Sequence, residues 1–218
     1  MLSIDPRETI VLLLGLAIAI AVHEFSHAAA ARLLGDRTAQ RAGRLTLNPL
    51  AHLDPMGTLM IVLSSVAGIG FGWGKPVPYD PSAVRFGRFG GALVSIAGPL
   101  SNFVLAAFAL AVAVHGPISE DFGRDIGRLA GLNIGLCAFN LLPIPPLDGF
   151  GVAVGVLPRT PAIALARLGQ YGPAILLILV FSANILPIRP SLLDRLVRLL
   201  EPVASTLERA ALFIVTGR

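Results

Sequence analysis

The most restrictive feature of the sequence is an N-terminal apolar run that is long enough to cross a lipid bilayer and carries three ionisable residues. The run extends from Glu8 to Leu34, which as an α-helix measures about 40 Å and spans the bilayer with some tilt. Lipid offers no hydrogen-bond partner to backbone N–H and C=O groups, so a helix is expected for such a segment. The sequence therefore predicts a membrane helix with His23, Glu24 and His27 inside it.

The composition extends this expectation to the whole chain. Of the 218 residues, 55% are hydrophobic and only 14% are charged, against about a quarter charged in soluble domains. No polar segment reaches the ~50 residues that a separate soluble domain requires. We therefore expect a single membrane-embedded domain over residues 1–218, with its core at 8–158 and a C-terminal span and amphipathic tail at 159–218.

The remaining apolar stretches predict an all-α polytopic protein. With the first run they give about four to six membrane helices, and the tail from Ser191 has the spacing of an amphipathic helix. Two segments differ: Thr58–Phe71 is short for a span, and Gly74–Pro81 has the alternating prolines of an edge strand or loop. The other apolar stretches are Phe89–His115, Ile126–Leu142, Gly149–Leu157 and Arg167–Leu186.

The three ionisable residues of the first run have the spacing of a metal site. His23 and His27 lie four residues apart, which places both imidazoles on one helix face. With Glu24 they form the HExxH pattern, in which the histidines bind zinc and the glutamate is the general base. The alternative is that they are ordinary polar residues facing neighbouring helices. A charged side chain at mid-membrane costs about 2.5–3.5 kcal/mol on insertion scales, which favours the metal site.

A third ligand must come from elsewhere, because catalytic zinc commonly has three protein ligands and a water. The candidates are His52, His115, Asp54 and Asp148. Asp148 is favoured because it follows prolines that interrupt a membrane helix, and such irregular backbone at membrane depth lines a polar cavity or is covered by protein. His115 closes an apolar stretch and is expected at the interface. His52 lies between Asn-Pro and Asp-Pro turns and is kept as a residue near the site.

Three motifs together resemble one known family. "HEFSH", "AGPLSN" (Ala97–Asn102) and "NLLPIPPLDG" (Asn140–Gly149) are similar, in residues and in order, to motifs of the site-2 protease family of intramembrane zinc metalloproteases. The resemblance covers roughly residues 15–155 and is to a compact prokaryotic branch without a PDZ or CBS domain. It implies Zn²⁺ as cofactor and hydrolysis of peptide bonds in transmembrane segments of membrane protein substrates.

The resemblance also implies roles for individual residues. His23, His27 and Asp148 correspond to the zinc ligands. Glu24 corresponds to the catalytic base. Asn140 is similar to an asparagine near the catalytic centre that steadies the substrate carbonyl or the oxyanion.

Two further residues of these motifs concern packing. Asn102 resembles a motif asparagine that helps to position the core spans. Phe150 is a departure, because many members have a second glycine after the Asp-Gly pair. The substitution puts the packing of this loop in question more than the activity.

The common depth of the expected ligands sets a condition on the topology. Four arginines lie in the last turn of the first helix and just after it. By the positive-inside rule the C-terminal end of this helix, near the two histidines, faces the cytoplasm. If Thr58–Phe71 crossed the membrane, Asp148 would lie at the outer face. We therefore predict that Thr58–Phe71 is a re-entrant or hairpin segment, and that the site faces the cytoplasmic side of a prokaryotic inner membrane. The four are Arg32, Arg37, Arg41 and Arg44.

Two other functions use the same residues. A metal transporter or channel would use the histidines and aspartate as a transit site, but it needs polar groups spaced across the membrane. A catalytically silent scaffold would bind partner helices. The expected partners are the lipid bilayer and a transmembrane protein or peptide, which Gly74–Pro81 would bind by strand addition. Nucleic acid is not expected, since the arginines flank apolar segments, and a homo-oligomer is left open.

Overall fold

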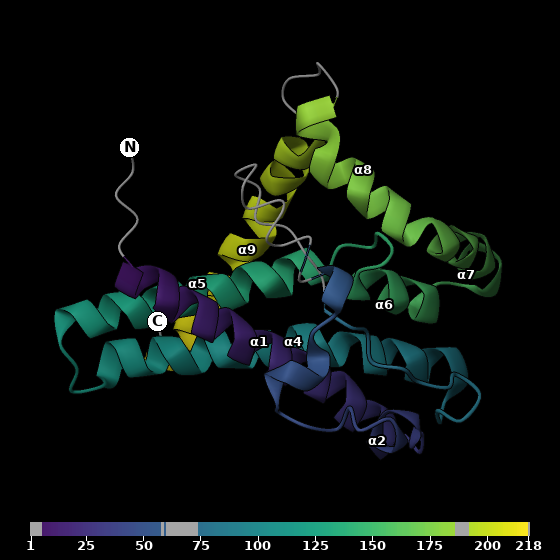
Figure 1. The fold of residues 1–218 in the computed structure, drawn as a ribbon, viewed down its shortest axis with the longest axis horizontal. Helices are drawn as coiled ribbons and strands as arrows, with labels where there is room; N and C mark the ends of the chain where they lie inside the picture. Colours follow the sequence, from purple (N-terminus) through teal and green to yellow (C-terminus); the bar gives the residue numbers. More distant parts are fainter. Residues whose placement is uncertain (1–5, 58, 60–73, 186–191, 218) are drawn as a thin grey trace.

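A computed structural model describes residues 6–57, 59, 74–185 and 192–217. In this part of the chain every regular element is a helix, which confirms the all-α prediction there (Figure 1). The α-helices are α1 (Pro6–Leu33), α2 (Thr38–Arg41), α4 (Gly87–His115), α5 (Glu120–Asn140), α6 (Asp148–Val156), α7 (Arg159–Ala166), α8 (Gly172–Ile185) and α9 (Leu192–Thr216), and the 3-10 helices are η1 (Pro49–His52) and η2 (Arg167–Tyr171).

Three long helices, α1, α4 and α5, lie alongside one another and form the centre of the molecule (Figure 1). The N–H of Arg85, just before α4, donates to the carbonyl oxygen of Leu34 at 2.9 Å, so α4 begins where α1 ends. At the opposite end, Arg7 near the start of α1 pairs with Asp125 near the start of α5 at 2.7 Å. Helix α4 is therefore antiparallel to α1, and α5 runs in the same direction as α1.

Small residues allow these helices to approach closely. Ala28 and Ala31 of α1 and Ala106 of α4 are completely buried. The large apolar side chains point outward instead, and Leu14 and Phe108 are more than 60% exposed. Lipid is as apolar as these side chains, so membrane helices associate by close packing of small residues rather than by burial of large ones.

Among the described residues, three helical stretches are long and apolar enough to cross a membrane: Thr9–Leu33, Gly87–His115 and Arg159–Leu179. The predicted total of four to six spans is not confirmed. The stretch predicted at 126–142 is largely covered by α5, but this helix begins at Glu120, and its first half carries charged residues that lower its hydropathy. The predicted amphipathic tail corresponds to α9, which contacts α4, α5 and α8.

The predicted strand over Gly74–Pro81 is not confirmed. Gly74 forms an isolated antiparallel bridge with Leu53, and residues 75–80 have no regular structure. The alternating prolines lack the N–H groups that a ladder requires. The predicted re-entrant segment, Thr58–Phe71, lies outside the described residues. The bridge holds Leu53, which precedes this segment in the sequence, beside Gly74, which follows it.

Buried polar side chains hold this irregular segment instead of a ladder. The N–H of Lys75 donates to the carbonyl oxygen of His52 at 2.8 Å. The buried guanidinium of Arg44 donates to the carbonyl oxygens of Lys75 and Ala51. The segment from Gly74 is therefore fixed by one short backbone bridge and by the guanidinium of Arg44, without a strand ladder.

Asp36 forms a second attachment of the segment. Its buried carboxylate accepts hydrogen bonds from the N–H and hydroxyl of Thr38 and, at 2.8 Å, from the N–H of Asp80. Burial raises the pKa of Asp36, but these hydrogen bonds lower it by more, so the pKa lies below its usual value. The segment is therefore tied to an ionised carboxylate just beyond the end of α1.

Candidate metal centre

The structure brings together three of the residues that the sequence predicts as ligands. His23 and His27 project from α1, and Asp148 is the first residue of α6. The Nε2 atom of His23 lies 3.0 Å from Oδ2 of Asp148, and that of His27 lies 3.3 Å from Oδ1. The two Nε2 atoms are 3.1 Å apart. The histidines are buried and Asp148 is half-buried, and one ligand atom from each residue lies within 4.8 Å of the other two.

The positions of the imidazole protons indicate a site for a cation. Nδ1 of His23 lies 2.6 Å from Oδ1 of Asn102, and Nδ1 of His27 lies 2.8 Å from the carbonyl oxygen of Val94. A carbonyl oxygen only accepts, so each neutral imidazole donates from Nδ1 and keeps a lone pair on Nε2. Two lone pairs and a carboxylate therefore face one another, and without a cation between them they would repel.

The spacing of the donors fits zinc. Donors about 2.0–2.1 Å from a tetrahedral zinc lie about 3.3 Å from one another. Here the two nitrogens are 3.1 Å apart, and each lies 3.0 or 3.3 Å from one of the two carboxylate oxygens of Asp148. Oδ2 of Asp148 is buried and has no hydrogen-bond partner among the described residues. Two histidine nitrogens and a carboxylate oxygen are also a donor set of catalytic zinc sites, which leave a fourth position for water.

The second motif, "AGPLSN", lies in α4 directly against the two histidines. A Cβ atom on Gly98 would lie only 2.3 Å from Nε2 of His27 and 2.7 Å from Cε1 of His23. Only glycine therefore allows the backbone of α4 to pass this close to the donors. Asn102, one turn further along α4, is completely buried and contacts His23. The motif thus supplies both close approach and a hydrogen bond to one of the histidines.

Glu24 is half-buried and lies outside the group of three converging donors. A Cβ atom on Gly74 would lie 3.9 Å from its Oε1 atom. The bridge between Leu53 and Gly74 therefore passes beside this carboxylate. Two segments far apart in the sequence, α1 and the irregular segment from Gly74, meet at the residue that the sequence predicts as general base.

The amide nitrogen of Asn140 is hydrogen-bonded within its own helix. Asn140 is the last residue of α5, and its Nδ2 group donates to the carbonyl oxygen of Leu136 at 3.0 Å, one turn back in the same helix. The predicted contact with a substrate carbonyl would require this group to turn away from Leu136. The role of Asn140 stays a prediction.

The three other candidates for the third ligand have different partners. His52 is completely buried in η1, and its Nε2–H donates to the carbonyl oxygen of Thr46 at 2.8 Å. Its own carbonyl holds Lys75, so it supports the segment that passes Glu24. Oδ1 of Asp54 accepts from the N–H of Gly57. His115, the last residue of α4, donates to the carbonyl oxygen of Val215 in α9.

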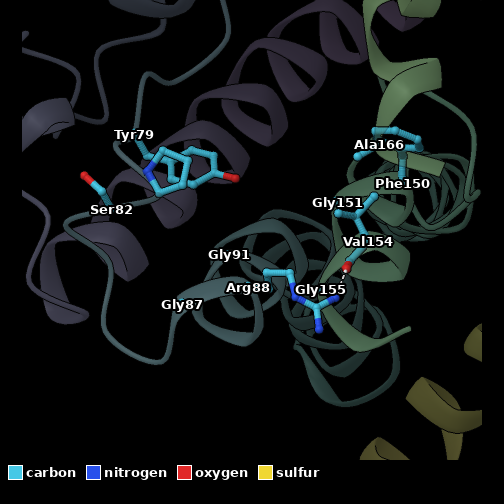
Figure 2. Close-up of a pocket in the computed structure, with 11 residues that line it drawn as sticks. Tyr79, Ser82, Gly87, Arg88, Gly91, Phe150, Gly151, Val154, Gly155 and Ala166 are labelled. Atoms are coloured by element: carbon cyan, nitrogen blue, oxygen red, sulfur yellow. Dashed lines mark hydrogen bonds between the residues drawn. The ribbon is translucent and has the colours of Figure 1, made fainter. Parts of the chain in front are cut away.

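A cleft of about 570 Å³ is lined by the start of α4, by α6 and by residues of the irregular segment between Tyr79 and Ser82 (Figure 2). Figure 2 shows Tyr79 and Ser82 on one side and Phe150, Gly151 and Val154 on the other. Phe150, which departs from the family pattern, lines this cleft. Arg88 closes the end of α6 by donating to the carbonyl oxygens of Val154 and Leu157 at 3.3 and 3.1 Å.

Sequence reasoning missed Asn133. This buried residue of α5 accepts a hydrogen bond from Nδ2 of Asn102 at 3.0 Å. The available signal was a carboxamide within the apolar stretch predicted at 126–142. Its partner could not be read from the sequence, because helix spacing does not show which helix faces it.

Comparison with known proteins places the chain among zinc metalloproteases. It is 38% identical to "putative zinc metalloprotease YwhC" of Bacillus subtilis over 177 residues, which covers 77% of this chain and 78% of the relative. It is 34% identical to the Rip2 protein of the same description from Mycolicibacterium smegmatis, covering 79% and 67%. The Mycobacterium tuberculosis Rip2 is 31% identical, covering 81% and 68%. No protein-family model and no solved structure matches the chain.

These similarities agree with the geometry of the site. The relatives are named for zinc, and the converging donors fit this ion, so the cofactor is Zn²⁺. The three apolar helices together with the relatives identify an integral membrane protein. The identity extends over more than three quarters of the chain in each case. The chain belongs to the site-2 protease family of zinc metalloproteases.

Proposed function

We propose that this protein hydrolyses peptide bonds within transmembrane segments of membrane protein substrates. In this proposal His23, His27 and Asp148 hold the zinc ion and Glu24 is the general base. One observation carries it: one ligand atom from each of His23, His27 and Asp148 lies within 4.8 Å of the other two, and the two histidines belong to a helix that is apolar enough to cross a membrane. The family supports a proteolytic activity, and the depth of the donors supports a substrate within the membrane.

The chemistry divides between the metal and the side chains. When bound, zinc polarises the scissile carbonyl and lowers the pKa of the attacking water. Glu24 accepts a proton from this water and delivers it to the nitrogen of the leaving amine. Asn140 contributes a hydrogen bond to the carbonyl oxygen once its Nδ2 group has turned from Leu136. The buried position of the histidines strengthens these interactions, because the surroundings screen charge weakly.

The substrate must enter as an extended chain, because the peptide bonds of a helix are hydrogen-bonded within it. Gly74 lies beside Glu24 and begins a segment without regular structure, and the backbone groups of this segment that the bridge, Arg44 and Asp36 do not hold would pair with the substrate. Pro76 and Pro78 leave this segment with fewer donors. Pairing with the substrate would therefore depend mainly on the carbonyl groups of this segment, which would accept from N–H groups of the substrate.

The orientation in the membrane follows from the arginines after α1. The end of α1, the short helix α2, the start of α4 and the irregular segment lie together, and they carry Arg32, Arg41, Lys75 and Arg85. By the positive-inside rule we place this end in the cytoplasm and the protein in a prokaryotic inner membrane. In this arrangement residues 1–218 form one domain with its metal centre towards the cytoplasmic side. Labelling of cysteines introduced at Lys75 and Arg85 from outside intact cells would contradict it.

The test of the proposal is the substitution Glu24→Gln in the purified protein, reconstituted with a reporter transmembrane substrate. Zinc content should stay at the wild-type level, because Glu24 is not one of the three donors, while cleavage should fall by at least about a thousandfold. Full cleavage by the variant would remove Glu24 from the mechanism. Zinc flux through proteoliposomes without cleavage by the wild type would favour a transporter, and neither activity would favour a scaffold.

A further inference from the structure

A line of buried hydrogen bonds reaches beyond the residues that the family motifs contain. It runs from α5 through α4 to α1 and consists of Asn133, Asn102 and His23, here called the asparagine relay. We propose that Asn133 is a positioning residue for His23: it fixes the amide of Asn102 in the one orientation that leaves the Nε2 lone pair of His23 directed at the metal. This inference rests on the proposed role of His23 as a zinc ligand.

Backbone carbonyls determine the direction of every bond in the asparagine relay. Nδ2 of Asn133 donates to the carbonyl oxygen of Leu129 at 2.9 Å, so its Oδ1 faces Asn102. Nδ2 of Asn102 donates to that Oδ1 at 3.0 Å and to the carbonyl oxygen of Ala19 at 3.4 Å. Oδ1 of Asn102 is then left to accept from Nδ1–H of His23 at 2.6 Å. The proton of the imidazole is thereby held on Nδ1.

Burial makes this arrangement costly to leave incomplete. Asn102 is completely buried, and His23 and Asn133 are 8% and 6% exposed. A carboxamide in apolar surroundings without partners loses its hydrogen bonds to water and gains none. A simpler role is a hydrogen bond that joins α4 to α5, as polar residues commonly do between membrane helices. That role does not explain why the relay ends on a nitrogen of a metal-site histidine.

The two histidines differ in how their protons are held. His27 donates to the backbone carbonyl of Val94, which cannot turn around. His23 donates to a side-chain amide, which can present either its oxygen or its nitrogen. Without Asn133, the remaining anchor of Asn102 is the 3.4 Å contact with Ala19. A reversed amide would donate to Nδ1 of His23 and shift the imidazole proton to Nε2, where it would face the metal.

The experiment compares Asn133→Leu with Asn133→Asp, and the readout is the dissociation constant for zinc in competition with a chelator, without substrate. Leucine removes the acceptor for Asn102, so zinc affinity should fall by about 10- to 100-fold, the usual effect of losing a residue that supports a metal ligand. Burial at position 133 disfavours the charged form of an aspartate, and the carbonyl and hydroxyl of the neutral form reproduce the acceptor and donor of asparagine. Asn133→Asp should therefore keep most of the affinity.

The control is Ile134→Ala, a buried neighbour on α5 outside the asparagine relay. It should lower the thermal unfolding midpoint and leave the zinc dissociation constant unchanged. If Asn133 had a purely structural role, Asn133→Leu would keep more zinc affinity than Asn133→Asp, because leucine suits an apolar helix better than aspartic acid. If Asn133→Leu cannot be purified, Asn133→Ala carries the same prediction. Wild-type zinc affinity in the leucine or alanine variant would overturn the proposal, as would equal weakening by aspartate.

Cleavage at saturating zinc separates this inference from the proposed function. Asn133→Leu should regain most of its cleavage when zinc is saturating, because Glu24 and the three donors are unchanged. If the wild type binds zinc but cleaves no membrane substrate, while the order of zinc affinities holds, the proposed function fails and the positioning role stands. If cleavage depends on Glu24 but the order of affinities is absent, only the positioning role fails.

Discussion

Two regions of this molecule hold polar groups away from water, and they do so in opposite ways. In the helical region around the metal centre, regular backbone positions the side chains, and close packing at Gly98 brings α4 against the histidines. In the irregular segment between Gly74 and Phe86, side chains position the backbone: Arg44 and Asp36 hold carbonyl and N–H groups that no helix or ladder satisfies.

The difference shows where precision is required. A tetrahedral metal tolerates little error in its donors, and helices on which every backbone group is already satisfied provide that rigidity. The irregular segment leaves most of its backbone groups between Lys75 and Asp80 without regular pairing, and it passes Glu24. We therefore expect substitutions in the helical region to affect zinc, and substitutions at the attachments of the irregular segment to affect stability while zinc binding is kept.

The largest effect is expected for Gly98→Ala. The new Cβ atom would lie 2.3 Å from Nε2 of His27, in the space where the donors converge. Zinc content of the purified variant, measured by atomic emission, should fall to background, and cleavage should disappear with it. The matched control is Gly91→Ala on the same helix, where the nearest atom to a new Cβ is the hydroxyl of Tyr79 at 3.6 Å, an ordinary contact. A full complement of zinc in Gly98→Ala would mean that α4 does not confine the histidines.

A smaller but still large effect is expected for Asp148→Asn. The variant keeps the shape of the side chain and loses the charge that balances the cation, so zinc affinity should fall by at least about a hundredfold, the upper end for a supporting residue. Chelator competition measures this. Asp54→Asn serves as the comparison, because Asp54 accepts from Gly57 outside the converging donors. Equal losses in the two variants would indicate a general effect of removing negative charge.

The smallest effect is expected for Asp36→Asn. The carboxylate accepts at both oxygens, from Thr38 and Asp80, and an amide has only one acceptor oxygen. Unfolding free energy at neutral pH should fall by about 1–3 kcal/mol, the usual range for hydrogen bonds to a charged group, while zinc content is unchanged. The control is Asp80→Asn. Because Asp80 is exposed, this substitution should lower the unfolding free energy by less than Asp36→Asn.

The same variant has a defined dependence on pH. The pKa of Asp36 lies below its ordinary value of 3.8 in the folded protein, so its stabilising effect is complete above that value and is lost as pH falls through the folded-state pKa. The difference in thermal midpoint between wild type and Asp36→Asn should therefore be constant near neutrality and shrink below about pH 4. A difference that grows on acidification would contradict an ionised Asp36.

Local patterns predicted much of the candidate site. The spacing of His23 and His27 depends only on the helical repeat, and the prolines before Asp148 predicted that a carboxylate would lie at a break in a helix. The family and its zinc followed from the three motifs, and the comparisons confirm both. The strand at Gly74–Pro81 and the number of spans were not confirmed, because alternating prolines and partly charged helices such as α5 satisfy more than one pattern.

The sequence by itself determined which groups are available: an apolar helix that must satisfy its own backbone, and on it two imidazoles one turn apart. The sequence also favoured Asp148 among the four candidates for the third ligand. The tertiary structure alone decided how Asp148 meets these imidazoles and which oxygen receives each proton. His27 donates to the backbone of α4, and His23 donates to an amide that α5 orients. The reason is that a helical repeat specifies neighbours within one helix, whereas contacts between helices depend on how closely residues such as Gly98 allow them to approach.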